Sequence, residues 1–303
     1  MRVRRPGKIA DNLWFLGRED CCVYLLEGAN GSMLINGGVS CIVPDMLEQF
    51  RTFRIDETRI NKLLILHSHF DHVGIVPFFK RRYPGMVIYG SARALDILQK
   101  PKAIEAINVA NHFVMGNTGN GDVCAQYDLD WRAGITGEAV ADGDHIDLGG
   151  SEVRIIETPG HSPCSLTAYV PHLQALFPSD AGGIPNGEKI VTYGTSSYST
   201  FEESLKKLST LDVSYLCSDH CGYVTGDKAA RYIDDTIKAA EARRLLMLDM
   251  YRRTGDVDGT ARELALRFKD ENIRDMVPYE TFVEAHRQVV MRVAGLRKPA
   301  GGV

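Results

Sequence analysis

The stretch that decides the fold reads His67-Ser68-His69-Phe70-Asp71-His72, and it comes directly after the apolar run Leu63-Leu64-Ile65-Leu66. A strand that ends in three imidazoles and a carboxylate presents several metal ligands from one rigid edge. Neutral imidazole nitrogens and carboxylate oxygens suit zinc, iron or manganese. Four ligands in one turn exceed what one tetrahedral ion needs once other segments contribute. The motif therefore predicts two metal ions and hydrolysis by a metal-held hydroxide.

Three later segments repeat this arrangement, in which an apolar strand ends in a ligand-type residue. His161 follows the run 153–156 and a Pro-Gly turn. Asp180 follows the run 175–177, and His220 follows the run 215–217. One such residue would be unremarkable, but three in this order are hard to explain by packing alone. We therefore interpret them as partners of the first motif.

Together, the HxHxDH motif, a TPGHS turn, a strand-end SD and a DHCG segment resemble the metallo-β-lactamase superfamily over about residues 8–226. The resemblance implies an α/β fold, a four-layer αββα sandwich with a dinuclear site at one edge of its paired sheets. The implied ligands are His67, His69 and His161 for the first metal ion, Asp71, His72 and His220 for the second, and Asp180 as a bridge. Asp71 would also orient the hydroxide or accept its proton, as the catalytic residue.

Four positions discriminate within the superfamily. Asp180, in place of Cys or Ser, resembles the hydrolases of thioesters, phosphodiesters and lactones more than the true β-lactamases. His69 speaks against the branch that reduces oxygen or nitric oxide, whose pattern carries Glu there. Asn36 replaces the usual Asp, and Asp219 stands where Gly commonly precedes the last His. Both departures bear on the support of the second metal ion.

A narrower resemblance concerns the parts outside the metal motifs. A helical insertion at about 91–138, the segment 139–143 after it and the helical tail resemble the PqsE-type thioesterases of quinolone signalling. This resemblance implies a bulky substrate of the acyl-thioester kind. We expect a catalytic domain over 1–226, which includes the insertion, and a C-terminal helical extension over 227–303.

Hydrophobic periodicity predicts the order of the elements. The expected strands are 13–16, 22–26, 32–35, 63–66, 86–89, 138–140, 146–148, 153–156, 166–169, 175–177 and, as the last strand, 215–217. The expected helices are 44–53, 75–83, 92–98, 103–113, 199–208, 227–251, 260–268 and 279–293. The alternation in the first part favours a layered α/β domain.

Composition narrows the class of protein. The 303 residues carry a net charge of -4 and 44% hydrophobic residues, which is ordinary for a globular protein. The sequence has no basic patch that would favour nucleic acid as a partner. No stretch approaches the roughly 18 apolar residues of a membrane span, and no apolar segment indicates a signal peptide. Seven cysteines without a CxxC pair favour reduced thiols in a cytoplasmic protein.

The substrate pocket is expected between the insertion, the loop at 185–199 and the C-terminal helices. Tyr193, His112 and His286 are candidate substrate contacts, although for each an ordinary packed or exposed residue is the alternative. Tyr279 and Phe282 are interpreted as core or dimer contacts in preference to substrate ligands. Arg243, with its neighbour Arg244, is interpreted as part of a solvated helix face, with recognition of a CoA or nucleotide phosphate as the alternative.

We favour a metal-dependent hydrolase of a thioester or related ester, with two divalent ions (zinc, iron or manganese) as cofactors. A phosphodiesterase or nuclease of the same fold is the enzymatic alternative, and the acidic composition counts against polynucleotides. A regulatory binding protein that keeps the metal site and acts through its helical tail is the third hypothesis. The expected partner is a small molecule, and the C-terminal helices are a candidate homodimer interface.

Overall fold

The computed structural model describes residues 1–272 and 276–296. Its centre is a pair of seven-stranded sheets. In spatial order, the first sheet contains β2 (Gly7–Ala10), β3 (Leu13–Arg18), β4 (Cys21–Gly28), β5 (Gly31–Ile35), β6 (Ile60–Leu64), β7 (Val87–Gly90) and β8 (Glu138–Ala139). The second contains β1 (Arg2–Val3), β16 (Tyr223–Thr225), β15 (Tyr215–Cys217), β12 (Ala175–Phe177), β11 (Leu166–Val170), β10 (Glu152–Glu157) and β9 (His145–Asp147). A separate hairpin pairs β13 (Ile184–Asn186) with β14 (Lys189–Val191).

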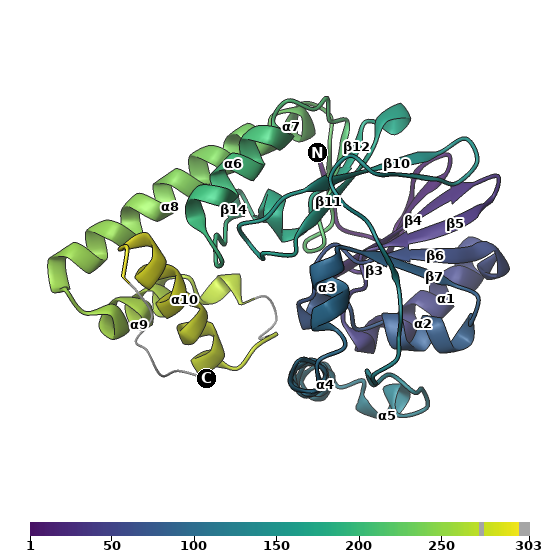
Figure 1. Cartoon of the computed structure of the whole chain (residues 1–303), viewed down its shortest axis with the longest axis horizontal. Coiled ribbons are helices and arrows are strands. Elements are labelled where there is room, and N and C mark those ends of the chain that lie inside the picture. The colour runs from purple at the N-terminus through teal and green to yellow at the C-terminus, as the bar shows by residue number, and fades with distance from the viewer. Residues whose placement is uncertain (273–275, 297–303) are drawn as a thin grey trace.

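Helices cover the outer faces of both sheets and form the C-terminal part of the chain (Figure 1). They are α1 (Val43–Phe53), α2 (Val76–Arg82), α3 (Ala92–Ile97), α4 (Pro101–Asn117), α5 (Gly121–Cys124), α6 (Tyr198–Leu208), α7 (Asp227–Ala230), α8 (Tyr232–Thr254), α9 (Val257–Arg267) and α10 (Tyr279–Val293). None of the described helices is long and apolar enough to cross a bilayer.

The apolar run before the metal motif shows how the layers form. Because side chains alternate along a strand, Leu63 and Ile65 pack in the cluster that includes α1 and α2, on the outer face of the first sheet. Leu64 and Leu66 point the other way and pack between the sheets, in the same cluster as Phe177 of β12. All four are fully buried, which explains why the run is continuously apolar.

The second sheet is covered in the same way on its far side. Leu176 of β12 and Leu216 of β15 pack with Phe201 of α6 and Ile233 of α8. The order helix, sheet, sheet, helix confirms the expected four-layer αββα sandwich. Beyond it, α8 runs outward and carries α9 and α10, which pack against each other as the expected C-terminal helical extension (Figure 1).

Two predicted features of the chain are wrong. The segment 215–217 is not the last strand, because β16 follows and pairs antiparallel with both β15 and β1. Only Tyr223, Val224 and Thr225 lie between Gly222 and Gly226, and two glycines so close together indicate a loop more strongly than three residues indicate a strand. The single helix expected at 227–251 is divided, since α7 ends at Ala230 and α8 begins at Tyr232 and continues to Thr254. The division into domains at residue 226 stays a prediction.

All seven cysteines lie in the part of the chain that the structure describes. Each is buried and carries a free thiol. The expected reducing compartment stays a prediction. Cys21 and Cys22 of β4 are fully buried in the core.

Candidate metal centre

The ligand-type residues meet because their strands end at one edge of the sandwich. β12 and β15 are parallel, and β10 runs in the same direction because it and β12 each pair antiparallel with β11. The segments after these strands therefore lie at a common edge, as is usual for sites built at the carboxyl ends of strands. His161 follows β10, Asp180 lies in the short 3-10 helix after β12, and His220 follows β15. The motif at 67–72 reaches the same place from β6.

The first group consists of His67, His69 and His161. His69 Nδ1 lies 3.0 Å from His67 Nε2 and 3.1 Å from His161 Nε2. A tetrahedral ion with bonds of 2.0–2.1 Å to nitrogen sets its ligand atoms about 3.3 Å apart. The three nitrogens thus have nearly the spacing that one bound ion requires, and the three residues form a cluster able to hold an ion.

The second group consists of Asp71, His72 and His220. His72 Nε2 and His220 Nε2 are 3.3 Å apart, and Asp71 Oδ2 is 3.5 Å from each. These distances again match the edges of a small coordination polyhedron. The group is therefore a second cluster able to hold an ion.

Asp180 lies between the two groups. Its Oδ2 is 3.5 Å from His161 Nε2 and 3.4 Å from His72 Nε2, so it reaches a ligand atom of each group. Its Oδ1 is buried without a hydrogen bond, 3.7 Å from His220 Nε2. A buried carboxylate oxygen without a donor is costly unless a cation compensates it. The residues present therefore fit two divalent ions bridged by Asp180.

The outward ring nitrogens of four of these histidines have acceptors. Three of them are backbone or carboxylate oxygens: Tyr193 O at 3.0 Å from His161 Nδ1, Asp20 O at 2.6 Å from His220 Nδ1, and Asp219 Oδ2 at 2.9 Å from His72 Nδ1. The fourth is the Ser179 hydroxyl, 3.2 Å from His67 Nδ1. An acceptor at Nδ1 holds the proton there and leaves the Nε2 lone pair directed into the cluster.

The protonation states also suit cations. Burial lowers the pKa of His67 and of His161, which keeps both imidazoles neutral and able to bind metal. Burial acts to raise the pKa of Asp180, but attraction to the nearby His72 outweighs burial and holds this pKa well below its ordinary value. The carboxylate is therefore ionised. Burial acts to lower the pKa of His72, but the charges of Asp71 and Asp180 raise it well above its ordinary value. Bound ions would replace that proton as the compensating charge.

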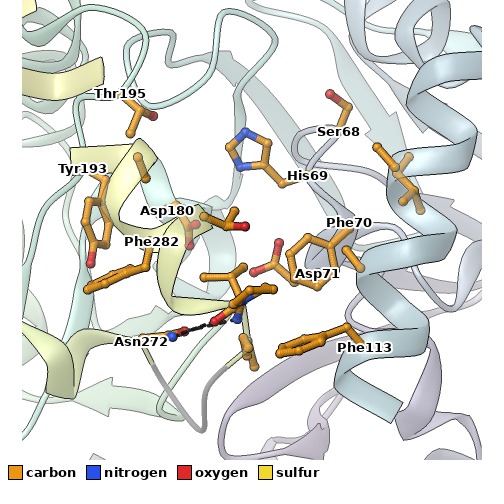
Figure 2. Close-up of a pocket in the computed structure, with 18 of the residues that line it drawn as sticks. Ser68, His69, Phe70, Asp71, Phe113, Asp180, Tyr193, Thr195, Asn272 and Phe282 are labelled. Atoms are coloured by element: carbon orange, nitrogen blue, oxygen red, sulfur yellow. Dashed lines mark hydrogen bonds between the residues drawn. The ribbon is translucent and has the colours of Figure 1, made fainter. Parts of the chain in front are cut away.

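A cavity of about 770 Å³ opens onto the metal groups. His69, Asp71 and Asp180 point into it from the sandwich, and Phe113 of α4 and Phe282 of α10 stand on opposite sides (Figure 2). The walls come from α4 of the insertion, from the loop after β14 and from the C-terminal extension, as expected. Phe282 is buried in a small core cluster, which agrees with its interpretation as a core contact, and it also lines the cavity.

The three candidate substrate residues have different places. Tyr193 lines the cavity, and its hydroxyl donates to Glu271 at 2.9 Å. His286 is buried behind the wall, where it donates to Phe282 O and accepts from Arg243. His112 lies on α4, bonds to Asp130 at 2.7 Å and borders a separate, smaller depression. The structure brings only Tyr193 to the cavity, and substrate contact by any of the three stays a prediction.

Arg243 does not belong to a solvated face, so that interpretation is wrong. Its side chain is 8% exposed and bonds to Glu271 at 2.7 Å. Its guanidinium also lies 4.9 Å from the ring centre of Tyr193 and 4.2 Å from that of Phe268. The charge is buried because all its partners come from segments that fold around α8.

Sequence reasoning missed the apolar residues that shape the cavity. On α4 they include Ala106, Ile107, Ala110 and Phe113. Their spacing of three and four residues marks one helical face, which a periodicity analysis of the insertion could have found.

Comparisons with known proteins agree with this geometry. The sequence profile of the metallo-beta-lactamase superfamily matches residues 16–220. A metallo-beta-lactamase fold-containing protein of Sulfurisphaera tokodaii is 24% identical, over 85% of this chain and 91% of that protein. A hydroxyacylglutathione hydrolase of Acidiphilium cryptum is 29% identical, over 56% of this chain and 79% of that protein.

Solved structures show the same fold. A metallo-beta-lactamase family protein of Thermus thermophilus superimposes with a TM-score of 0.65 at 19% identity, over 95% of each chain. The narrower resemblance to PqsE-type thioesterases stays a prediction. The profile match covers more than half of the chain and includes all seven candidate ligands, so the protein belongs to the metallo-β-lactamase superfamily.

Proposed function

We propose that this protein is a hydrolase that uses two divalent metal ions to cleave a thioester or a related carboxylic ester. One observation carries the proposal. Asp180 lies near a ligand atom of each group, and residues of both groups line a single cavity of small-molecule size. A site that only stabilised the fold would be closed to solvent, whereas this one leaves room for a substrate at the metal positions.

The residues of the chain divide the work as follows. His67, His69 and His161 would hold one ion. Asp71, His72 and His220 would hold the other, and Asp180 would contribute to both. When bound, the ions would supply Lewis acidity toward the scissile carbonyl and lower the pKa of a water molecule. Asp71 lines the cavity, and its carboxylate would orient such a water molecule and accept its proton. The identity of the metal stays open among zinc, iron and manganese.

A relative's name supports an acyl substrate. The matching protein of Acidiphilium cryptum is named as a hydrolase of hydroxyacylglutathione, an acyl conjugate of a thiol. A thiolate leaves without strong protonation, and this suits a cavity in which Asp71 is the group best placed to handle a proton.

The test is a turnover screen combined with one ligand variant. Purified protein is assayed on acyl thioesters, lactones and phosphodiesters, and its metal content is measured by elemental analysis. His69→Ala is expected to lower thioester hydrolysis by at least about 100-fold, since it removes one metal ligand. His145→Ala is the matched control, because this exposed histidine on β9 lies outside both groups.

Three outcomes would contradict the proposal. Unchanged hydrolysis in His69→Ala would place the activity elsewhere. Turnover of phosphodiesters alone would favour the phosphodiesterase of the same fold. A metal-loaded protein without turnover on any class, whose partner function survives His69→Ala, would favour the regulatory binding protein.

We also propose a cytoplasmic location and a homodimer through the C-terminal helices. Seven unpaired cysteines support the first, because such thiols persist in a reducing compartment. Exposed apolar side chains on the extension support the second: Leu245, Leu266, Tyr279 and Leu296. Light scattering on the purified chain tests the dimer, and Leu245→Glu with Leu266→Glu should yield a monomer.

A further inference from the structure

The cavity beside the metal groups has two apolar walls. One wall is a single face of α4 and consists of Ala103, Ala106, Ile107, Ala110 and Phe113. The other comes from the C-terminal extension and consists of Met276, Val277, Pro278, Phe282 and Ala285. Both walls lie beyond the metal ligands, so a molecule whose reacting group sits at the ions would extend its remainder between them (Figure 2).

The described part of the cavity lining offers no cationic side chain to a negative charge. No lysine or arginine is among the described residues that line it. Among the same described residues, the one acidic side chain apart from the metal groups is Glu271, which is bonded to Arg243 at 2.7 Å behind the wall. A carboxylate or phosphate placed between the two walls would lose its hydration without gaining a partner, which is costly. An apolar group gains from the same burial.

We propose that the space between α4 and the extension binds the neutral, apolar acyl group of the substrate, aliphatic or aryl. This inference rests on the proposed hydrolase function and specifies its substrate class. Neutral acyl groups are favoured over charged ones, and the polar or charged leaving group remains outside the two walls. The insertion and the extension together then determine which ester the metal site cleaves.

A series of thioesters tests the proposal. The acetyl, butanoyl, hexanoyl, decanoyl, benzoyl and succinyl thioesters of N-acetylcysteamine share one neutral leaving group. Burying a methylene is worth about fourfold in kcat/KM where the contact persists in the transition state. We expect hexanoyl to exceed acetyl by at least about 10-fold, and butanoyl to exceed its charged counterpart succinyl by at least about 100-fold. Equal rates for acetyl and decanoyl, or a preference for succinyl, would overturn the proposal.

A filled cavity provides the matched variant. Ala110→Phe places a ring in the space between the walls, and it is expected to lower the ratio of decanoyl to acetyl turnover by at least about 10-fold. Ala242→Phe makes the same change at an exposed position of α8 outside the cavity, and should leave the ratio unchanged. A ratio that changes equally in both variants would contradict the assigned place of the acyl group.

A binding measurement separates this proposal from the proposed function. S-decyl-N-acetylcysteamine, a thioether that cannot be hydrolysed, is titrated into the metal-loaded protein by calorimetry. Binding that Ala110→Phe weakens, without turnover of any thioester, would support the apolar site and contradict the hydrolase. Hydrolysis of thioesters that shows no chain-length preference, in a protein that does not bind the thioether, would support the hydrolase and contradict the apolar acyl site.

A second inference rests on a buried carboxylate behind the metal-ligand histidines. Asp219 is fully buried, and its Oδ2 accepts from His72 Nδ1 at 2.9 Å. The same oxygen accepts from the Ser179 hydroxyl, which in turn faces His67 Nδ1 at 3.2 Å. One carboxylate is thereby linked to a histidine of each group.

We infer that Asp219 is a positioning residue for both metal groups. We also infer that a carboxylate at position 36, where the chain has Asn36, could take over its role toward His72. Asn36 Oδ1 lies 3.2 Å from the same His72 Nδ1 and already accepts from Gly37 N. An acceptor on Nδ1 fixes the orientation of a ligating imidazole and makes it a better donor to the metal. A carboxylate at position 36 would act on His72, but it would not reach His67 through Ser179.

Metal affinity and rescue test this inference. Asp219→Asn keeps the shape and removes the charge, and chelator competition is expected to show both ions bound about 10- to 100-fold more weakly. Adding Asn36→Asp should restore the affinity of the ion at Asp71, His72 and His220 by at least about 10-fold, but not that of the other ion. Unchanged affinity in Asp219→Asn would overturn the inference, as would equal rescue of both ions or of neither.

Discussion

Arg243 and Glu271 form an ion pair that is buried on both sides, with Nη1 2.7 Å from Oε2 and side chains 8% and 5% exposed. Glu271 also accepts from the Tyr193 hydroxyl, so the pair joins the extension to the loop that carries this tyrosine. His286 and Phe268 complete the surroundings of the guanidinium. One wall of the cavity is therefore supported by charge as well as by apolar packing.

Removal of one partner should destabilise the protein strongly. Glu271→Ala leaves the Arg243 charge buried without its carboxylate, which costs about 3–5 kcal/mol of unfolding free energy. Urea denaturation measures the change. Glu280→Ala is the control, because the Arg262–Glu280 pair is exposed and contributes less than about 1 kcal/mol. Equal losses in the two variants would show that Glu271 is not a buried partner in solution.

Gly160 should tolerate no side chain. Its φ is +129°, and an added Cβ would lie 2.3 Å from the backbone N of Phe201. Gly160→Ala should therefore displace the turn before His161 and lower both the unfolding free energy and the metal affinity. The loss of unfolding free energy should exceed the about 1–3 kcal/mol that backbone strain alone would cost. Gly143→Ala is the control, with a φ of +86° and open space around the Cβ. A similar loss in both variants would mean that the contact with Phe201 is unimportant.

The convergence of the ligand residues could be predicted because each follows an apolar strand. His161, Asp180 and His220 are far from the first motif in sequence, but strands with the same direction in one sheet bring their ends together. The residue types and their order carried this information locally. The apolar layers followed in the same way from alternation along strands such as 63–66.

Other features depend on contacts that no local pattern encodes. Arg243 sits in a helix with alternating charge, and its burial depends on Glu271, 28 residues away, and on Tyr193. Asp219 was recognisable as a departure, but its contact with His72 spans 147 residues. Such pairings follow from how the extension and the loops pack, which a one-dimensional reading cannot supply.

The number of bound ions should follow the two ligand groups. Wild-type protein is expected to bind two ions per chain, and His220→Ala to bind one, because the first group keeps all three imidazoles. Elemental analysis after dialysis measures the stoichiometry. His172→Ala, at an exposed histidine outside both groups, should keep two ions. Saturation of the wild type at one ion would exclude a dinuclear site.

Acid should destabilise the protein in part through His286. Burial, followed by the nearby Arg243 charge, lowers the pKa of His286 to about 4 from its ordinary 6.5, despite its bond to Phe282 O. A lowered histidine pKa means that the unfolded chain binds the proton first. The stabilising contribution is therefore complete above pH 6.5 and is lost as the pH falls toward 4, by up to about 3 kcal/mol.

Unfolding free energies measured across this pH range test the contribution. His286→Gln keeps an acceptor for Arg243 but does not titrate, so its stability should fall less steeply with acid than that of the wild type. The metal-ligand histidines titrate equally in both proteins, and the difference between the two curves isolates His286. His145→Gln, at the exposed end of β9, should follow the wild-type curve. Parallel curves for wild type and His286→Gln would mean that His286 is not held neutral by burial.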